Sequence, residues 1–318
     1  MIGRSGLDSK KRTKYRQLKL RTNHQRVSDS GSIVHRVIIF LGLVVLLILL
    51  TKSIPYILNH LSKGAEDELQ SLNDEDGSRF YLPLSGGEVV HHSYYSLSYI
   101  EKHELSEWVC YELTRESLRL PRVPRHNWFD ADPKVKTLSA VHADFNGSGY
   151  DRGHLVPAAD MAFSDTAMKE TFYMSNITPQ VRQFNNGIWR ELEEQVRDWA
   201  FKSGRVIVVS GPILTKGIRG KIGRNGVSVP SYFYKIVLNI SSEENDAIAF
   251  IIPNELSEKP LQEYAVTIDS VEVITGIDFF AELFNPALQE KIESNIDLGK
   301  WRFSESRYKL RVEKWNKQ

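Results

Sequence analysis

The residues best suited to chemistry lie in the segment from Asp151 to His154, which reads Asp-Arg-Gly-His. A histidine, with an ordinary pKa of about 6.5, can take a proton from water. An arginine can bind phosphate oxygens through two parallel hydrogen bonds. On an extended segment Arg152 and His154 point to the same face, because they are two residues apart. The pair suits hydrolysis of a phosphate ester, provided that a cation neutralises the charge on the phosphate and on the leaving oxygen.

The local sequence leaves a purely structural interpretation open as well. Asn146-Gly147 and Gly149 are turn signals just before the segment, so we expect His154 on or beside a β-hairpin. In such a turn His154 could be a hydrogen-bonded structural histidine, and Asp151 could form an ion pair with Arg152. These four residues alone do not decide between the two interpretations.

Two further segments favour the chemical interpretation. The string "SNITPQ" from Ser175 precedes "NNGIW" from Asn185, which opens a segment with apolar residues at helical spacing. Taken in order, "GSGYDRGHLVPAAD", "TFYMSNITPQ" and "NNGIWRELEEQVR" closely resemble the DNA/RNA non-specific endonuclease family, which includes secreted bacterial nucleases and mitochondrial endonuclease G. Supporting similarity runs from "HHSYYSLSY" through "VVSGPI" and "VSVPSYFYKIVL" to about Phe284. The resemblance implies the ββα-metal (His-Me finger) fold.

The resemblance also implies a role for each matching residue. His154 becomes the base that activates water, and Arg152 contacts the phosphate. Asn185 becomes the sole direct protein ligand of a hydrated Mg²⁺, for which Mn²⁺ can substitute, and Asn186 is a weaker candidate for the same position. Mg²⁺ keeps several waters and accepts few protein ligands, so a single amide oxygen suits it.

Three more residues receive roles from the same resemblance. Glu193 holds metal-bound waters, Asn176 helps to orient the site, and Arg197 is a second phosphate-facing arginine. Asn185 and Glu193 are about 80° apart around a continuous α-helix, which suits one direct and one indirect contact with the metal. Two alternatives stay open: Arg197 as a plain surface partner of Glu193 one turn away, and Asn185 as a helix N-cap.

The positions of β-type and helical patterns predict an α+β fold with a central mixed or antiparallel sheet flanked by helices. The apolar spacing within Ile188–Ala200 predicts an amphipathic helix. Ser164 is expected to cap a short helix that runs through Met168, and Ser270 to start another that runs through Ile274. Runs of β-branched and aromatic residues predict strands at Tyr94–Tyr99, Trp108–Leu113, Arg205–Ser210, Tyr232–Ile240 and Ile248–Ile252.

An uncharged, almost wholly aliphatic run lies near the N-terminus, from Val37 to Thr51. Extended to residues 33–54, it is long enough for a hydrocarbon core of about 30 Å. We therefore predict one transmembrane helix there, with a buried core helix or a cleaved signal peptide as alternatives. Residues 1–36 carry ten lysines and arginines against two aspartates, so the N-terminus should stay cytoplasmic and the C-terminal domain should lie across the membrane.

The same charge bias leaves the rest of the chain net acidic, although the whole chain has a net charge of +1. Phosphate contacts must therefore come from a local patch, for which Arg122 and Arg125 are candidates. Cys110 is the only cysteine, which excludes an internal disulfide and a zinc site of several thiolates. The remaining histidines of the domain show no paired-ligand spacing, and we expect them to be structural or exposed: His91, His92, His103, His126 and His142.

These observations predict a basic cytoplasmic tail (1–32), a transmembrane anchor (33–54), an acidic linker (55–80), a nuclease domain (81–295) and a C-terminal tail (296–318). The predicted activity is Mg²⁺-dependent, sequence-nonspecific endonuclease hydrolysis of DNA and RNA, with 5′-phosphate and 3′-hydroxyl ends as the resemblance implies. One alternative is a catalytically silent, membrane-bound module for nucleic-acid binding or uptake. Another is a phosphodiesterase for a different substrate, such as a lipid head group.

The predicted location is a single-pass membrane protein with the nuclease domain on the outer, periplasmic side of a bacterial membrane. The alternative is the mitochondrial inner membrane with the domain in the intermembrane space, because the N-terminus is rich in arginine and lysine and poor in acidic residues. The family resemblance also suggests a homodimer.

Overall fold

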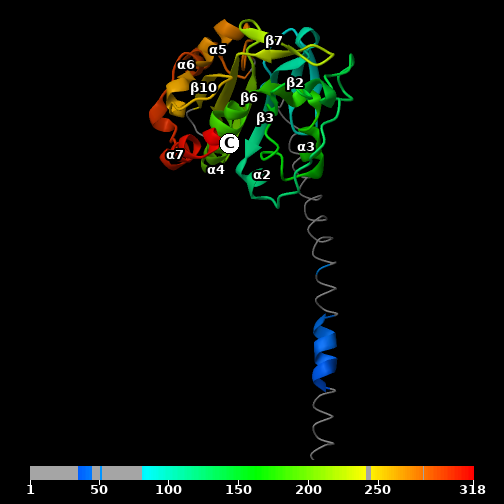
Figure 1. The fold of residues 1–318 in the computed structure, drawn as a ribbon. Helices are drawn as coiled ribbons and strands as arrows, with labels where there is room; N and C mark the ends of the chain where they lie inside the picture. Colours follow the sequence, from blue (N-terminus) through cyan, green and yellow to red (C-terminus); the bar gives the residue numbers. More distant parts are fainter. Residues whose placement is uncertain (1–34, 45–50, 52–80, 241–244, 282) are drawn as a thin grey trace, which may run out of the picture. The chain divides into compact units, whose positions relative to one another are not determined.

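Strands of the domain form one seven-stranded antiparallel sheet, with helices on both faces (Figure 1). All five predicted strands are present within it, with ends shifted by up to three residues. The fold class is therefore α+β with an antiparallel sheet, as predicted. In spatial order the strands are β1 (Glu88–His91), β2 (Ser96–Ile100), β3 (Leu105–Thr114), β6 (Arg205–Pro212), β9 (Tyr232–Asn239), β10 (Asp246–Pro253) and β11 (Ala265–Val266).

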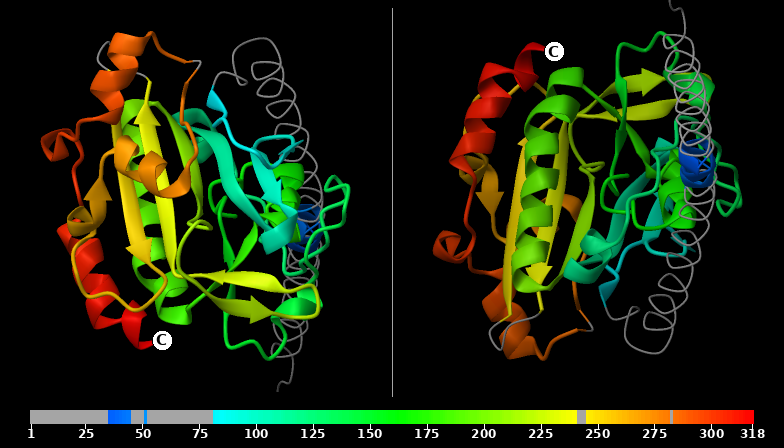
Figure 2. Two further views of the ribbon diagram at one scale, coloured as in Figure 1. Left: turned by 90° about the horizontal axis from the view of Figure 1, so that it is seen from above. Right: turned by 90° about the horizontal axis from the view of Figure 1, so that it is seen from below.

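Side chains alternate between the two faces of the sheet, because successive residues of a strand point in opposite directions. Phe233 and Val237 of β9 pack in one buried cluster with α4 (Arg190–Ser203). Tyr234 and Ile236 pack in a second cluster with α5 (Ile268–Thr275) and α6 (Pro286–Glu293). In the view from below, Figure 2 shows α4 lying along its face of the sheet. Two hydrophobic cores thus share one sheet.

The predicted helix at Ile188–Ala200 is confirmed as α4, which ends at Gly204 with a φ of 102°. Its apolar residues Leu192, Val196 and Trp199 are buried against the sheet. A π-helical turn, η5 (Phe184–Trp189), precedes it, and Gly187 inside that turn has the non-helical angles φ −102° and ψ −109°. The spacing of about 80° between Asn185 and Glu193 assumed a continuous α-helix, so it is wrong.

A separate two-stranded sheet carries the Asp-Arg-Gly-His segment. β4 (Asp151–His154) pairs antiparallel with β5 (Ile177–Gln180), and the connection between them contains α3 (Asp165–Glu170) rather than a tight turn. Ser164 caps α3 as predicted, since its side chain accepts a hydrogen bond from the Ala167 amide. The glycine of the segment has a packing reason: a Cβ on Gly153 would lie 2.0 Å from the side chain of Gln180.

The remaining elements surround these sheets. The helix predicted to start at Ser270 is α5, which begins at Ile268 with Thr267 as its N-cap. A hairpin that the sequence pattern did not reveal consists of β7 (Ile218–Ile222) and β8 (Val227–Pro230). The shorter helical segments are α2 (Arg115–Arg119), η2 (Glu101–His103), η3 (His142–Phe145), η4 (Met174–Asn176), η6 (Leu261–Tyr264), η7 (Leu298–Lys300) and η8 (Trp315–Lys317).

The predicted C-terminal tail, residues 296–318, packs onto the nuclease domain. It contains α7 (Glu305–Glu313), which lies beside α4 (Figure 2). Arg311 has no exposed surface and forms an ion pair with Glu191 of α4. Trp315 is buried and receives the guanidinium of Arg190 over its ring at 4.0 Å. The segment is thus an integral part of the folded unit.

The structure is a computed structural model that describes residues 35–44, 51, 81–240, 245–281 and 283–318. Contacts divide the chain into two units, Met1–Leu61 and Ser62–Gln318. Residues 35–44 are helical. Within the described ranges, no helix has both the length and the apolar character needed to cross a membrane. The predicted basic tail and acidic linker lie outside the described residues, as does much of the predicted anchor 33–54.

Candidate active site

His154 lies at the end of β4 in an aromatic environment and is only 8 % exposed. The ring of Phe172 meets it edge-on at a centroid distance of 4.8 Å, and that of Phe129 lies 5.8 Å away. Its Nε2 is buried and has no hydrogen-bond partner among the described residues. Burial, followed by the nearby charge of Arg125, lowers the pKa of His154 to about 3. The imidazole is therefore neutral at pH 7 and has a ring nitrogen available.

Arg152 lies two residues before His154 on the same strand, and two side chains hold its guanidinium. Its Nη2 lies 3.0 Å from Oδ1 of Asn146 and 3.2 Å from Nε2 of His142. Its guanidinium stands over the rings of Phe129 and Phe145 at 5.6 Å and 5.8 Å. Its Nε is buried without a hydrogen-bond partner in the described part of the chain. The structure thus holds Arg152 in place and leaves one donor unused.

Asp151, the first residue of β4, pairs with residues of η5 and its preceding turn instead of with Arg152. Its Oδ2 accepts hydrogen bonds from Nδ2 of Asn185 at 3.2 Å and of Asn186 at 3.5 Å. Its Oδ1 lies 3.3 Å from the guanidinium of Arg182. The ion pair between Asp151 and Arg152, considered as an alternative from the sequence, is not formed. Asn185 lies inside η5, so it is not a helix N-cap either.

Glu193 of α4 lies next to a group of charged side chains under the helix. Arg197, one turn further on, forms an ion pair of 2.7 Å with Asp160, whose side chain has no exposed surface. Asp160 also accepts a hydrogen bond of 2.8 Å from the hydroxyl of Tyr111. Because Arg197 is 19 % exposed and bound to Asp160, the plain surface pair with Glu193 is not what the structure shows.

Lys235 of β9 adds a buried cation to this group. It has no exposed surface, its Nζ has no hydrogen-bond partner among the described residues, and it stands 4.6 Å from the ring centroid of Trp189. Burial raises the pKa of Glu193, while the positive charges of Lys235 and Arg197 oppose that rise. Burial lowers the pKa of Lys235, and the charge of Glu193 opposes that change. Each ionised group therefore stabilises the other.

Asn176, another predicted site residue, is completely buried in the protein. It has no exposed surface, and its amide is fully used within the protein. Its Oδ1 accepts from the Val156 amide at 2.9 Å, and its Nδ2 donates to the carbonyls of Val156 and Thr171 at 3.1 Å and 2.8 Å. Asn176 therefore fixes the chain immediately after His154.

Arg125 lies near both His154 and the charged group around Glu193. Its charge acts on both His154 and Glu193, so the imidazole and the carboxylate lie within electrostatic reach of one guanidinium. It stands 5.1 Å over the ring of Phe172, which itself contacts His154. Arg122, the other arginine suggested from the sequence, donates to the carbonyl of Ala159 at 3.2 Å. Of the two candidates, Arg125 is the one beside the site.

Several residues of the arrangement were missed from the sequence. Asp160 and Lys235 lie within the strings "GSGYDRGHLVPAAD" and "VPSYFYKIVL", so the family resemblance marked their segments without marking them. Phe129 and Phe172 surround His154; Phe172 lies within the string "TFYMSNITPQ" without having been marked, and Phe129 comes from a segment that carried no motif. The sequence has no signal for an aromatic wall of this kind, because it depends on long-range packing.

The oxygen atoms at the site fit a hard divalent cation. Asn185 uses its Nδ2 on Asp151, and no hydrogen bond within the described residues uses its Oδ1. Glu193 likewise accepts no hydrogen bond in the described part of the chain, although cations surround it. An amide oxygen and a carboxylate are the kinds of donor suited to Mg²⁺, which prefers oxygen and keeps much of its water.

Comparisons with known proteins show the family to which the chain belongs. A family model described as DNA/RNA non-specific endonuclease matches residues 74–285. The chain is 34 % identical over 245 residues to human mitochondrial nuclease EXOG, a match that covers 70 % of this chain and 66 % of the relative. It is 36 % identical to nuclease C1 of Cunninghamella echinulata, over 67 % of this chain and 90 % of the relative. Human mitochondrial endonuclease G is 34 % identical, over 58 % and 67 % of the two chains.

A solved structure extends the similarity to three dimensions. The crystal structure of the EndoG/EndoGI complex superposes with a TM-score of 0.60 at 31 % identity, over 65 % of this chain and 90 % of that chain. The chain spans slightly less than two thirds of the length of the human, zebrafish and mouse EXOG nucleases, with 66 %, 66 % and 65 % covered.

Proposed function

Because the chain belongs to the DNA/RNA non-specific endonuclease family, we propose that it is a metal-dependent endonuclease that hydrolyses DNA and RNA without sequence preference. The observation that supports this most is the state of His154. Its Nε2 is buried, unpartnered in the described part of the chain, and kept neutral by burial. A structural histidine normally has its ring nitrogens satisfied, because an unpaired buried polar atom is unfavourable.

In the proposed reaction His154 takes a proton from the attacking water. Without a bound phosphate, a histidine with a pKa of about 3 is a weak base. A phosphate placed beside it adds negative charge, which raises the pKa of a histidine and strengthens it as a base. The aromatic rings of Phe129 and Phe172 restrict where His154 can point, so the proton is accepted at one defined position.

Asn185 and Glu193 would hold the cation, through an amide oxygen and through bound waters. When bound, Mg²⁺ supplies charge neutralisation at the scissile phosphate and the leaving 3′-oxygen, and Mn²⁺ is the expected substitute. Asp151 orients Asn185, because it accepts the amide hydrogen bond and so turns the oxygen away from itself. Lys235 and Arg197 favour the ionised form of Glu193, although burial outweighs them and raises its pKa to about 7.

The two arginines have separate proposed roles. Arg152 contacts the phosphate through its guanidinium, of which only Nη2 takes part in hydrogen bonds among the described residues. Arg197 faces the phosphate from α4 and is held in place by Asp160. Asn176 acts as a positioning residue, because its amide is fully bonded to the chain after His154. Contacts limited to backbone phosphates would explain cleavage without sequence preference and would make binding depend strongly on salt.

The test is a nuclease assay on the full-length chain in detergent. Plasmid DNA and RNA should both be degraded with Mg²⁺, and degradation should stop with EDTA. His154→Ala should remove the activity, and cleavage by this variant at the wild-type rate would show that the mechanism is wrong. Phospholipid vesicles in place of nucleic acid distinguish a lipid phosphodiesterase. Binding of DNA without any cleavage would instead support a silent binding module.

We further propose that residues 33–54 anchor the chain in a membrane. The uncharged aliphatic run and the basic residues before it support this. The mitochondrial names of human EXOG and human endonuclease G favour the mitochondrial inner membrane over a bacterial one. Alkaline carbonate extraction of the full chain and of a chain lacking 33–54 tests the anchor: only the full chain should stay with the membrane. Light scattering of the solubilised chain tests the suggested homodimer.

A further inference from the structure

A second group of ionisable side chains lies far from His154 in the fold. Asp269 and Glu272 belong to α5, and Glu293 is the last residue of α6. One carboxylate oxygen from each residue lies within 4.8 Å of the other two. Both helices pack on the cluster of the second sheet face, whereas α4 and Glu193 belong to the first. The group is therefore separate from the candidate active site.

Glu293 is the least compensated member of this group. It is only 7 % exposed, and its Oε1 is buried without a hydrogen-bond partner among the described residues. Glu272, in contrast, accepts a hydrogen bond from the Phe279 amide at 2.8 Å. No salt bridge within the described ranges involves any of the three carboxylates.

The charged groups around Glu293 are all negative. Burial, and then the negative charge of Glu272, raises the pKa of Glu293 to about 8; a hydrogen bond from Gln289 opposes this rise, while Asp269 and Asp278 add to it. Buried carboxylates normally have a basic partner or a metal ion, since an isolated buried charge is strongly unfavourable. Within the described residues no basic side chain pairs with Glu293, and a bound cation would favour its ionised form.

We propose that Asp269, Glu272 and Glu293 bind one hard divalent cation of the Ca²⁺ class, which joins the first turn of α5 to the end of α6. Ca²⁺ takes oxygen ligands at about 2.3–2.6 Å, so oxygens on opposite sides of the ion are about 5 Å apart. The spacing of the three oxygens meets this condition. A donor set without nitrogen or sulfur disfavours zinc and copper. Mg²⁺ is less suitable, because it demands near-ideal octahedral geometry and gives up its water reluctantly.

Bound Ca²⁺ would stabilise the packing of α5 and α6 on the second face of the sheet. It would take no part in phosphodiester cleavage, because α5 and α6 pack in a different cluster from α4, which carries Glu193. Separate variants therefore distinguish the two sites: Glu293→Gln should remove the rise in Tm with Ca²⁺, and Asn185→Ala should lower the cleavage rate.

The experiment measures thermal unfolding of the full-length chain in detergent, first in EGTA and then with CaCl₂ or MgCl₂. At a hundredfold excess of Ca²⁺ over its Kd, mass action predicts a rise in Tm of about 5–10 °C for the wild type. Glu293→Gln should lose this rise, and in EGTA it should be about as stable as the wild type, because the amide has nearly the same shape as the carboxyl group and cannot ionise. Mg²⁺ should produce a smaller rise than Ca²⁺.

Two control variants separate this site from other divalent sites. Glu290→Gln changes an exposed carboxylate of the same helix and should keep the full Ca²⁺ response. Asn185→Ala removes the proposed catalytic ligand and should also keep it. Should Glu293→Gln fail to fold, Asp269→Asn, which changes a less buried ligand, gives the same comparison. A Ca²⁺ response in Glu293→Gln or in Asp269→Asn equal to that of the wild type would overturn the proposal, and so would a wild type without any Ca²⁺ response.

Discussion

Two histidines of the domain, His92 and His154, are each 8 % exposed, yet their surroundings are opposite. Nε2 of His92 lies 2.9 Å from a carboxylate oxygen of Asp132. Its Nδ1 is buried without a hydrogen bond among the described residues but lies 3.7 Å from a carboxylate oxygen of Glu170. Nε2 of His154 has no partner among the described residues and is surrounded by aromatic rings. From the sequence His92 was expected to be structural or exposed, whereas His154 was predicted to be the general base.

The electrostatic consequences differ accordingly. Burial lowers the pKa of both histidines, but at His92 the two carboxylates outweigh burial and raise the pKa above 6.5. At His154 the charge of Arg125 adds to burial, and the pKa falls to about 3. A charged His92 holds segments of the fold together, while a neutral His154 remains able to accept a proton. Partners, more than burial, therefore determine what a buried histidine can do.

The largest expected effect concerns the cation proposed to lie near His154. Asn185→Ala should lower the cleavage rate by about 10²–10⁴-fold, because a bound metal supplies several kcal/mol of transition-state stabilisation. Asn186→Ala is a matched control, since both amides donate to the same oxygen of Asp151. Single-turnover cleavage of a short duplex with Mg²⁺ measures the difference. Equal losses in the two variants would contradict the assignment of Asn185 as the ligand.

A large effect on stability is expected at the partnered histidine. Asp132→Asn leaves a buried His92 without its closest counter-charge, and breaking such a pair costs about 3–5 kcal/mol. The Tm should fall by about 10 °C. The cleavage rate per folded molecule should stay near that of the wild type. Asp130→Asn, at an exposed position two residues away, should leave the Tm unchanged, and a Tm loss of similar size there would undermine the interpretation.

The stability that a charged His92 provides should depend on pH, and this effect is smaller than that of Asp132→Asn. Because the folded-state pKa of His92 is raised above 6.5, its charge stabilises the fold fully below pH 6.5. This contribution disappears as the pH rises through the folded-state pKa. Denaturant unfolding of the wild type and of His92→Gln should therefore differ most below pH 6.5 and converge at higher pH. A difference that grows with rising pH would have the wrong sign.

The smallest effect is expected at Arg125. Arg125→Gln removes a positive charge beside His154 and should raise the pKa of that histidine, since the charge of Arg125 is one cause of its low value. The acidic limb of the pH–rate profile should move to higher pH by a fraction of a pH unit. Arg122→Gln, the other arginine of this segment, should leave the limb in place. A shift in the opposite direction would mean that Arg125 acts differently from the way we propose.

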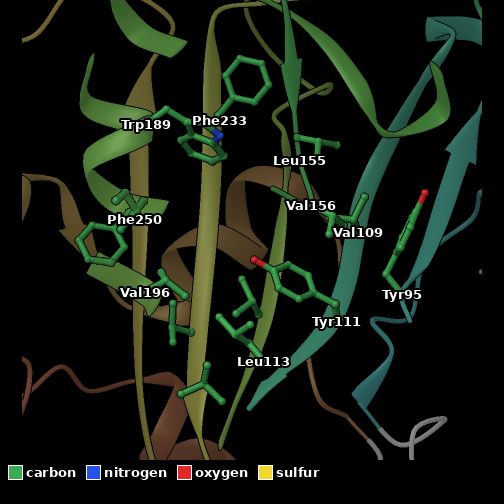
Figure 3. Packing of buried hydrophobic residues seen from close by; sticks show 14 of the residues in the cluster. Tyr95, Val109, Tyr111, Leu113, Leu155, Val156, Trp189, Val196, Phe233 and Phe250 are labelled. Atoms are coloured by element: carbon green, nitrogen blue, oxygen red, sulfur yellow. The ribbon is translucent and has the colours of Figure 1, made fainter. Parts of the chain in front are cut away.

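The sequence predicted local features of the fold well. Periodicity and side-chain chemistry predicted the strands, the helix α4 and the cap at Ser164. The predicted ends lie within a few residues of the observed ones. Trp189 of η5 and Val196 of α4 pack in one buried cluster with Phe233 and Phe250 of the sheet (Figure 3), as the apolar spacing of the predicted helix indicated.

Features that depend on distant contacts were not predictable. The pairing of Asp160 with Arg197 joins residues 37 positions apart, and that of His92 with Asp132 joins residues 40 apart. Lys235 occupies a strand position that looks solvent-facing by type but is fully buried. The π-helical turn at Gly187 changes the direction from Asn185 to Glu193 without a pattern that marks it. Candidate site residues could be proposed from the sequence, whereas their partners required the structure.

The most direct test of the contrast compares His154→Gln with His92→Gln in the full-length chain. Single-turnover cleavage of DNA with Mg²⁺ is measured alongside the folded fraction at the same temperature. We predict that His154→Gln loses about 10²–10⁴-fold in rate and keeps its folded fraction, as expected for removal of a general base. His92→Gln should lose stability and keep its rate per folded molecule. A His154→Gln variant that cleaves as fast as the wild type would contradict the assignment of His154 as the general base.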